Sequence, residues 1–254
     1  MSTAHYTQLP PAYGATEAAR PRASDDDDDV PDDFKHGVTV GQSVLSIRHA
    51  FMRKVYTILT LQILATAVVG GYMRHVDATN GFLLRHVWTV YAAMFGSLAA
   101  MVGVWWKANS HPTNIVLLSV FTLLEGYTLG AVTAFYPTPV VLQALVITLG
   151  LFVALTLFTM QSSYDFSRMG PILFFMLWAV ILVGFVQIFL PFNRTFDLVV
   201  AAVSALVFCG YIMYDTHMIM NRMSPDDYVL ASVSLYLDIV NLFLAILRIL
   251  GDRD

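Results

Sequence analysis

Seven long apolar runs follow one another along the chain, separated by short polar segments. The runs cover roughly residues 55–73, 86–107, 114–135, 139–160, 170–190, 197–220 and 229–249. A helix of about 20 apolar residues is long enough to cross the ~30 Å hydrocarbon core of a bilayer. The pattern therefore predicts an all-α integral membrane protein, a bundle of seven transmembrane helices.

The polar segments between the runs are too short to hold a soluble domain. They read NSHPTN, YPTP, SSYDFSRMG, PFNRT and NRMSPDD. Proline is placed at the boundaries, where it starts or stops a helix at little cost. These prolines are Pro112, Pro137, Pro139, Pro171, Pro191 and Pro225.

The first 46 residues have a different composition from the rest. They hold eight acidic and three basic residues, whereas the remaining 208 carry a net charge of +1. They are rich in Pro, Ala and Asp and show no apolar period, which is typical of disorder. We predict a disordered acidic N-terminal tail at 1–46 and a seven-helix transmembrane domain at 47–254. The DDDDD run could attract cations or basic partners, but a solvated tail is the simpler interpretation.

The distribution of Lys and Arg near the span ends predicts the orientation. With the N-terminus inside, the inner side holds Arg48, Arg53, Lys54, Lys107, Arg168 and Arg222. The outer side holds Arg74, Arg85, Arg194, Arg248 and Arg253. The basic cluster before the first run favours a cytosolic N-terminus, and seven spans then place the C-terminus on the opposite side. A re-entrant last segment would reverse that.

Three acidic residues, Glu125, Asp215 and Asp238, fall inside the apolar runs. A carboxylate at the centre of a bilayer costs about 2.5–3.5 kcal/mol on insertion scales. Such groups must be neutralised, paired or exposed to water. Asp215 and Asp238 lie on consecutive helices at depths that differ by only about 6 Å. They can therefore face each other and share a proton, and losing the last proton would push the two helices apart.

The last run carries a polar stripe that predicts a central helix. Ser234, Asp238, Asn241, Ala245 and Arg248 recur at spacings of 4, 3, 4 and 3. A face this polar belongs against other helices or water rather than lipid. For Asp238, a simple packing role remains an alternative.

Glu125 allows two interpretations. Thr122 and Thr128 lie on its helical face, so a packing hydrogen bond and a role in an ion path are equally open. Gly126 and Gly130 form a small-xxx-small pair that lets this third run approach a neighbouring helix closely.

Several classes of function receive no support from the sequence. The single cysteine, Cys209, cannot form an intrachain disulfide. HExxH, GxSxG, GxGxxG and P-loop motifs are absent, so we assign no metal site, no cofactor and no enzymatic activity. Only 13% of the residues are charged, half the usual share in soluble domains.

Several stretches resemble a known family. IMYDTHMI at 212–219 and SLYLDIVNLFLAILRILG at 234–251 resemble the last two helices of the Bax-inhibitor family, also called the transmembrane Bax inhibitor motif family. HPTNIVLLSVFTLLEGYTLG at 111–130 and FMRKVYTILTLQILAT at 51–66 resemble its lifeguard-like branch. VPDDFKHGVTV at 30–40 is similar to the segment that precedes the membrane in fungal members.

This resemblance implies a fold, a function and site residues. It implies a seven-helix bundle with the last helix central, a pH-sensitive calcium leak across intracellular membranes and a role in restraining cell death. The family's pH-sensing aspartate pair matches Asp215 and Asp238. Prokaryotic members have an arginine latch at the inner end of the second helix. Here VGVWWKANS offers only Lys107 as a candidate latch cation.

We therefore expect a calcium leak of the endoplasmic reticulum, Golgi, vacuole or mitochondrion, gated by protonation of Asp215 and Asp238. The transported ion would be Ca²⁺, which prefers oxygen ligands, and Glu125 and Asn241 are candidates for its path. The expected partners are the bilayer, calcium ions and cell-death regulatory proteins, with no nucleic acid. The alternative is a non-conducting scaffold that binds cell-death or stress-signalling proteins. An intramembrane enzyme is a weaker third option.

Overall fold

A computed structural model describes residues 39–42, 45–75, 79–190 and 193–251, and all regular elements in these ranges are helices. Of the predicted tail at 1–46, residues 1–38, 43 and 44 lie outside the described residues. In chain order the elements are η1 (Val40–Gln42), α2 (Leu45–His75), α3 (Thr79–Arg85), α4 (Val87–Trp106), α5 (Thr113–Thr133), α6 (Thr138–Gln161), η2 (Phe166–Met169), α7 (Gly170–Phe189), α8 (Arg194–Asn221) and α9 (Tyr228–Gly251).

The described part of the chain contains seven helices that are long and apolar enough to cross a membrane. They are α2 and α4 to α9, with mean hydropathies between 1.5 and 2.6. The short α3 lies between the first two of them. The prediction of an all-α, seven-helix membrane protein is confirmed, and the protein is an integral multi-pass membrane protein. α9 is one continuous helix of 24 residues.

The first helix begins ten residues earlier than the predicted span. Its first turns are amphipathic: Phe51 and Val55 are buried, whereas Arg53 and Lys54 are exposed. The Lys54 ammonium lies 3.3 Å from the centre of the Tyr228 ring, a cation–π contact. A search for continuous apolar runs misses such a turn because its basic residues face outward.

The ordered body also begins before the predicted boundary at residue 46. Val40 in η1 is fully buried, and its backbone N–H donates to the Met223 carbonyl at 2.9 Å. Residues 40–42 are therefore part of the helical body, packed against the end of α8.

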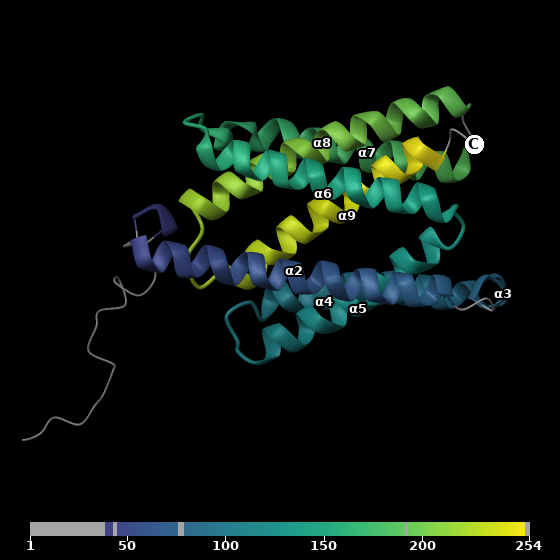
Figure 1. Cartoon of the computed structure of the whole chain (residues 1–254), viewed down its shortest axis with the longest axis horizontal. Coiled ribbons are helices and arrows are strands. Elements are labelled where there is room, and N and C mark those ends of the chain that lie inside the picture. Colours follow the sequence, from purple (N-terminus) through teal and green to yellow (C-terminus); the bar gives the residue numbers. More distant parts are fainter. Residues whose placement is uncertain (1–38, 43–44, 76–78, 191–192, 252–254) are drawn as a thin grey trace, which may run out of the picture. The chain divides into compact units, whose positions relative to one another are not determined.

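The helices form two layers with α9 between them (Figure 1). One layer holds α2, α4 and α5, and the other holds α6, α7 and α8, while α9 crosses diagonally from one end of the bundle to the other. In the most apolar stretch of α9, 67% of the residues are buried, compared with 6% in the span that contains α7. The prediction that the last helix is central is confirmed.

Two glycines of α5 let it pack closely on α2. A Cβ at Gly126 would lie 3.3 Å from the Thr66 Cα, and one at Gly130 would lie 3.3 Å from the Gly70 Cα. These contacts are tighter than ordinary van der Waals packing, so the small residues set the distance between the two helices. The predicted role of this glycine pair is confirmed.

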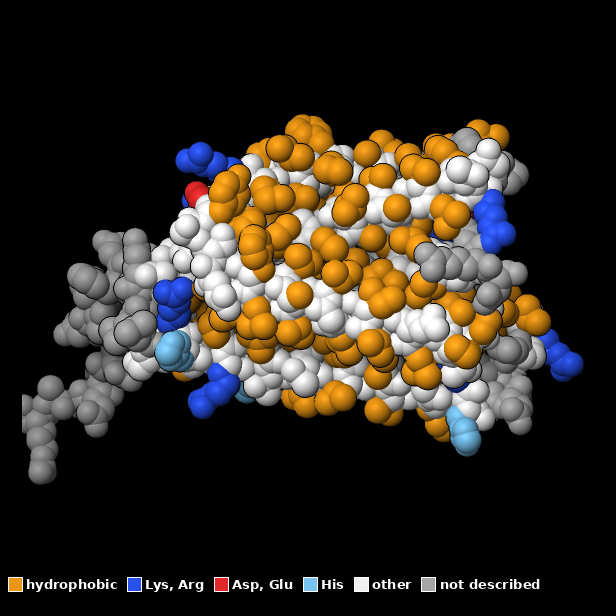
Figure 2. Space-filling view, turned by 45° about the horizontal axis from the view of Figure 1, so that its top comes forward, with side chains coloured by type: hydrophobic (Ala, Val, Ile, Leu, Met, Phe, Trp, Pro, Cys, Tyr) orange, Lys and Arg blue, Asp and Glu red, His pale blue; other side chains and the backbone are white. Residues whose placement is uncertain are grey.

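The outer surface has the character of a membrane protein. Figure 2 shows hydrophobic side chains covering the visible face, with Lys, Arg and His gathered towards its two ends. Large apolar residues such as Trp178 and Phe185 of α7 are more than half exposed. This surface suits contact with lipid rather than water.

Candidate functional site

Asp215 and Asp238 lie on the two helices of the α8–α9 hairpin. The loop at 222–227 is short, so α8 and α9 pack against each other along their lengths. Asp215 is about six residues from the end of α8, and Asp238 lies near the middle of α9. Asp215 and Asp238 are near enough for their charges to influence each other. Sharing of a proton by the two carboxyl groups stays a prediction.

The surroundings of the two carboxyl groups differ. Asp238 is 5% exposed, and its Oδ2 has no hydrogen-bond partner among the described residues. Asp215 is partly exposed and lies beside the Ser234 hydroxyl, one turn before Asp238 on α9. Tyr211, one turn before Asp215, lies within electrostatic range of both acids. A buried carboxyl oxygen without a partner is costly when charged, which favours a protonated or water-contacting state.

Lys107 is not in contact with this pair. It follows the last residue of α4, and its side chain is exposed at the end of the helix. Within the described ranges, no Lys or Arg forms an ion pair with Asp215 or Asp238. The position that the family resemblance suggested for a latch is therefore solvent-facing in this structure, and the shared charge of the pair has no cationic neighbour there.

Glu125 lies in a second polar group, between α5, α4 and α9. It is half-buried beside the Ser97 hydroxyl of α4 and within electrostatic range of Tyr236. The Tyr236 hydroxyl is hydrogen-bonded to the Thr66 hydroxyl of α2 at 2.8 Å. The Ser97 hydroxyl itself donates to the Met94 carbonyl at 2.9 Å. Glu125 thus lies among polar residues of three other helices.

Three polar residues from the sequence prediction bond to their own helices, and Thr122 bonds to α2 as well. The hydroxyls of Thr122 and Thr128 donate to the carbonyls one turn earlier, at 2.8 and 3.0 Å. The Thr122 hydroxyl also accepts from the Gln62 side-chain amide at 3.2 Å. Asn241 donates to the Leu237 carbonyl at 2.8 Å. The group that faces Glu125 is Ser97, which the pattern of one helix could not reveal because it comes from another.

A cluster of buried hydroxyls lies near Asp215 and was not expected from the sequence. Tyr56 of α2, Thr156 of α6 and Thr216 of α8 have buried hydroxyl oxygens without a hydrogen-bond partner in the described part of the chain. The Tyr56 hydroxyl points towards both threonines. Buried hydroxyls are normally satisfied by one another or by ordered water, so this cluster is suited to hold a water molecule.

Arg248, the last member of the polar stripe, ties α9 to two other helices. Its Nη2 lies 3.1 Å from Oδ1 of Asp197 in α8 and donates to Oε1 of Gln187 in α7, also at 3.1 Å. Gln187 in turn donates to Asp197 at 2.8 Å. This network fixes the end of α9 opposite the α8–α9 loop.

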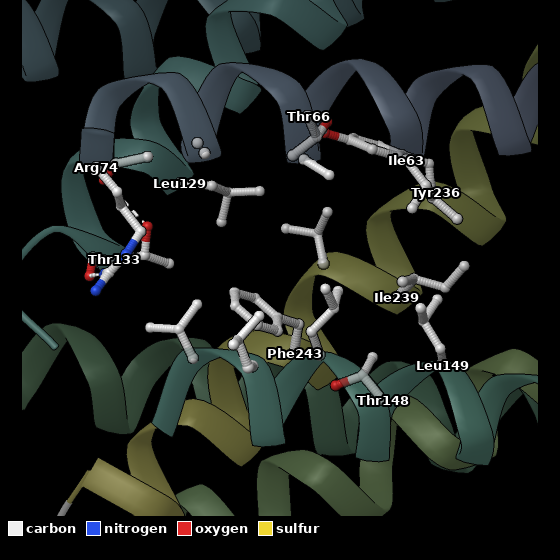
Figure 3. A pocket seen from close by; sticks show the side chains of 18 residues that line it. Ile63, Thr66, Arg74, Leu129, Thr133, Thr148, Leu149, Tyr236, Ile239 and Phe243 are labelled. Atoms are coloured by element: carbon white, nitrogen blue, oxygen red, sulfur yellow. Dashed lines mark hydrogen bonds between the residues drawn. The ribbon is translucent and has the colours of Figure 1, made fainter. Parts of the chain in front are cut away.

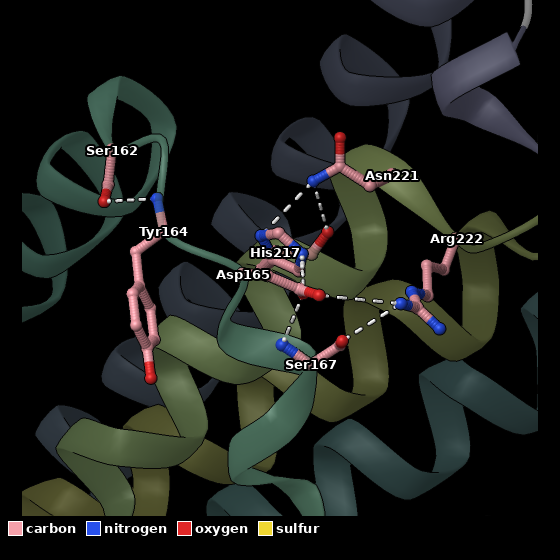
Figure 4. Close-up of polar contacts among 7 residues, drawn as sticks. All are labelled: Ser162, Tyr164, Asp165, Ser167, His217, Asn221 and Arg222. Atoms are coloured by element: carbon pink, nitrogen blue, oxygen red, sulfur yellow. Dashed lines mark hydrogen bonds and ion pairs between the residues drawn. The ribbon is translucent and has the colours of Figure 1, made fainter.

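At the other end of α8, a polar cluster connects the loop before η2 to α8 (Figure 4). Asp165 Oδ1 lies 3.0 Å from Nε2 of His217, and Asp165 also accepts from the Ser167 backbone N–H at 3.0 Å. Arg222 donates to the Ser167 hydroxyl at 3.0 Å and lies 3.9 Å from Asp165. Asn221 supports the imidazole through a 3.3 Å contact with Nδ1. The sequence singled out neither Asp165 nor its pairing with His217.

The neighbours of Asp165 stabilise its negative charge. Hydrogen bonds from Ser167, first from its side chain and then from its backbone, lower the pKa of the solvent-exposed Asp165, and the charges of His217 and Arg222 add to that shift. Asp165 is therefore a carboxylate at neutral pH.

No group of three or more His, Cys, Asp or Glu side chains is placed to hold a metal ion in the described part of the structure. Cys209 is a partly buried free thiol.

Comparisons with known proteins agree with the sequence resemblance. Residues 48–254 match the model of a family described as inhibitor of apoptosis-promoting Bax1. The chain is 41% identical over 251 residues to Bax inhibitor 1 of Schizosaccharomyces pombe, covering 98% of this chain and 92% of the relative. It is 45% identical over 221 residues to the Golgi anti-apoptotic protein of vaccinia virus (87% and 93% covered). It is 41% identical over 235 residues to mouse protein lifeguard 4 (92% and 96% covered).

Proposed function

Because the chain belongs to the Bax inhibitor family, we propose that it is a calcium leak channel gated by proton binding to Asp215 and Asp238. The observation that carries this proposal is the carboxyl pair between α8 and α9, in which Asp238 is buried with one oxygen unpartnered among the described residues. Intramembrane acids of this kind mark ion and proton pathways.

The gate follows from the electrostatics of two like groups. While the pair holds a proton, α8 and α9 stay packed, because only one negative charge must be accommodated. When the last proton leaves, two carboxylates repel each other with no cation beside them. α9 also packs against α2 and α6, so its displacement would loosen the contact between the two layers.

The polar side chains between the two helical layers would offer oxygen ligands to Ca²⁺, which binds six to eight oxygens. The hydroxyls of Tyr56, Thr156 and Thr216 lie at the end of the bundle where α2 begins and α8 ends. The carboxyl pair and Glu125 would supply charged ligands further along. We propose Ca²⁺ as the transported ion, with no resident cofactor and no enzymatic role.

Flux measurements test conduction directly. The purified full chain is reconstituted into liposomes that contain a calcium-sensitive dye, and calcium is added outside. The proposal expects dye signals above those of empty liposomes and of liposomes with an unrelated seven-helix protein. Flux equal to empty liposomes at every pH would contradict it.

We propose that this leak operates in an endomembrane and restrains cell death, with a cytosolic N-terminus. The support is a vaccinia relative named for the Golgi and for anti-apoptotic action. Expression of the chain in cells treated with a death stimulus should increase survival. If the leak is responsible, the double variant with Asp215→Asn and Asp238→Asn should lose this effect.

A non-conducting scaffold is the second candidate, favoured by the acidic composition of the N-terminal segment. Its test is a deletion that stops at residue 38, because Val40 is buried in the helical body. If the protein is a scaffold, the deletion should abolish capture of cell-death regulators and leave calcium flux unchanged. Normal capture by the shortened chain would contradict it.

A further inference from the structure

A cavity of about 190 Å³ opens between the two helical layers (Figure 3). It is bounded by α2, α5, α6 and α9, and its lining is almost entirely hydrocarbon. The floor is formed by α9, where Tyr236, Ile239 and Val240 are buried. Nothing in the proposed gating mechanism uses this space.

The cavity is open on the side that faces lipid. Ala67 and Gly71 of α2 and Leu142 of α6 line it and are also exposed on the outer surface. A Cβ at Gly71 would meet no atom within 4 Å. Small residues on α2 thus leave a gap opposite α6, and hydrocarbon from the bilayer can reach the floor through it.

One cation lies at the end of this cavity. Arg74, the second-last residue of α2, lines the cavity and donates to the carbonyls of Thr133 and Tyr136 and to the Thr138 hydroxyl. These acceptors are neutral, and no carboxylate pairs with Arg74 within the described ranges. Arg74 is at the end of a helix long enough to span a bilayer, where a guanidinium is expected at the level of the lipid headgroups.

The lining decides which kind of molecule fits. The hydroxyls of the lining are already hydrogen-bonded, Thr66 to Tyr236 and both Thr133 and Thr148 to their own helices. Water, which needs two to four polar partners, therefore gains little here, whereas an engineered apolar cavity of ~150 Å³ binds benzene. We propose that the cavity holds one acyl chain of a negatively charged phospholipid, whose phosphate is bound by Arg74. The chain would lie against Ile239 and Val240, directly beside Asp238 on α9.

Photochemical labelling tests whether a lipid acyl chain enters the cavity. The full-length protein is reconstituted in phosphatidylcholine vesicles that contain phosphatidylglycerol with a diazirine in its acyl chain. After irradiation, labelled residues are located by mass spectrometry. Label on Ile239, Val240 or Phe243 reports entry, because α9 is reached from lipid through the cavity, and label on Phe175 of α7 serves as the internal reference for lipid-facing surface.

A variant that fills the mouth of the cavity, with a matched control, distinguishes binding in the cavity from labelling of the outer lipid-facing surface. Gly71→Phe places a ring in the open mouth and should abolish α9 labelling while Phe175 labelling is kept. Gly184→Phe on α7 also meets no atom within 4 Å, and it should leave both signals unchanged. Absence of α9 label in the wild type, or equal α9 label in Gly71→Phe, would overturn the proposal.

The headgroup is tested with the same photoreactive chain on phosphatidylcholine. Phosphatidylglycerol should label α9 more strongly, and Arg74→Gln should reduce that preference about tenfold, the loss expected for one charge-assisted hydrogen bond. Equal labelling by the two lipids in the wild type would overturn the assignment of an anionic headgroup.

Discussion

At the residue scale, the account depends on the burial of Asp238. The sequence was sufficient to select Asp215 and Asp238, because an acid inside an apolar run is rare and costly. It was not sufficient to find the groups around the acids in the membrane helices. Ser97, which lies beside Glu125, and Tyr56 and Thr156, which lie near Asp215, come from other helices. Partners that meet only through tertiary packing leave no signal in the pattern of a single helix.

Asp238→Asn should stabilise the protein at alkaline pH. The amide keeps the size and polarity of the acid but removes a charge that costs up to about 2.5–3.5 kcal/mol in the membrane interior. Raising the pH removes protons from carboxyl groups, so the wild type should lose thermal stability in detergent as the pH rises, more steeply than the variant. Asp226→Asn, an exposed acid in the loop of the same hairpin, is the matched control and should behave like the wild type. Identical pH profiles for the wild type and Asp238→Asn would contradict this prediction.

The contact between Asp165 and His217 should hold the loop before η2 against α8. The pKa of Asp165 is lowered, so the carboxylate is charged at neutral pH and can accept from the imidazole Nε2 at 3.0 Å. We expect His217→Ala, which removes this partner, to speed proteolytic cleavage in the loop before η2. Equal cleavage rates for the wild type and His217→Ala would show that this contact does not hold the loop.

At the element scale, the spans were predicted well and their ends less well. Hydropathy located all seven membrane helices, since each requires an apolar run of bilayer length. The first helix and η1 begin earlier than expected because their buried residues, Val40, Phe51 and Val55, alternate with exposed basic and polar ones. Amphipathic turns at a membrane surface need a helical period rather than a continuous run to be recognised.

Gly126→Leu should separate α2 from α5. Its Cβ alone would lie 3.3 Å from the Thr66 Cα, so backbone must move, and overpacking of this kind costs about 1–3 kcal/mol. We expect a lower midpoint of thermal unfolding in detergent. Gly184→Leu, where a Cβ meets no atom within 4 Å, should leave the midpoint unchanged. Equal midpoints for the two variants would show that α5 does not depend on this close approach.

At the scale of the whole molecule, α9 joins three sites along its length. It contacts the acyl-chain cavity through Ile239 and Val240, carries Asp238 between the layers, and is held at its end by Arg248. A helix that is central and polar on one face can transmit a change at the carboxyl pair to both layers. The resemblance and the polar stripe predicted this central position, whereas the cavity is a property of packing between helices distant in the sequence.

The central claim is tested most directly by calcium flux into proteoliposomes, scanned between about pH 5 and 8. Three proteins are compared: the wild type, the double variant that carries both Asp215→Asn and Asp238→Asn, and the loop control Asp226→Asn. The account predicts that flux changes with pH in the wild type and in Asp226→Asn and is independent of pH in the double variant. The same pH dependence in all three proteins would contradict the assignment of Asp215 and Asp238 as the gate.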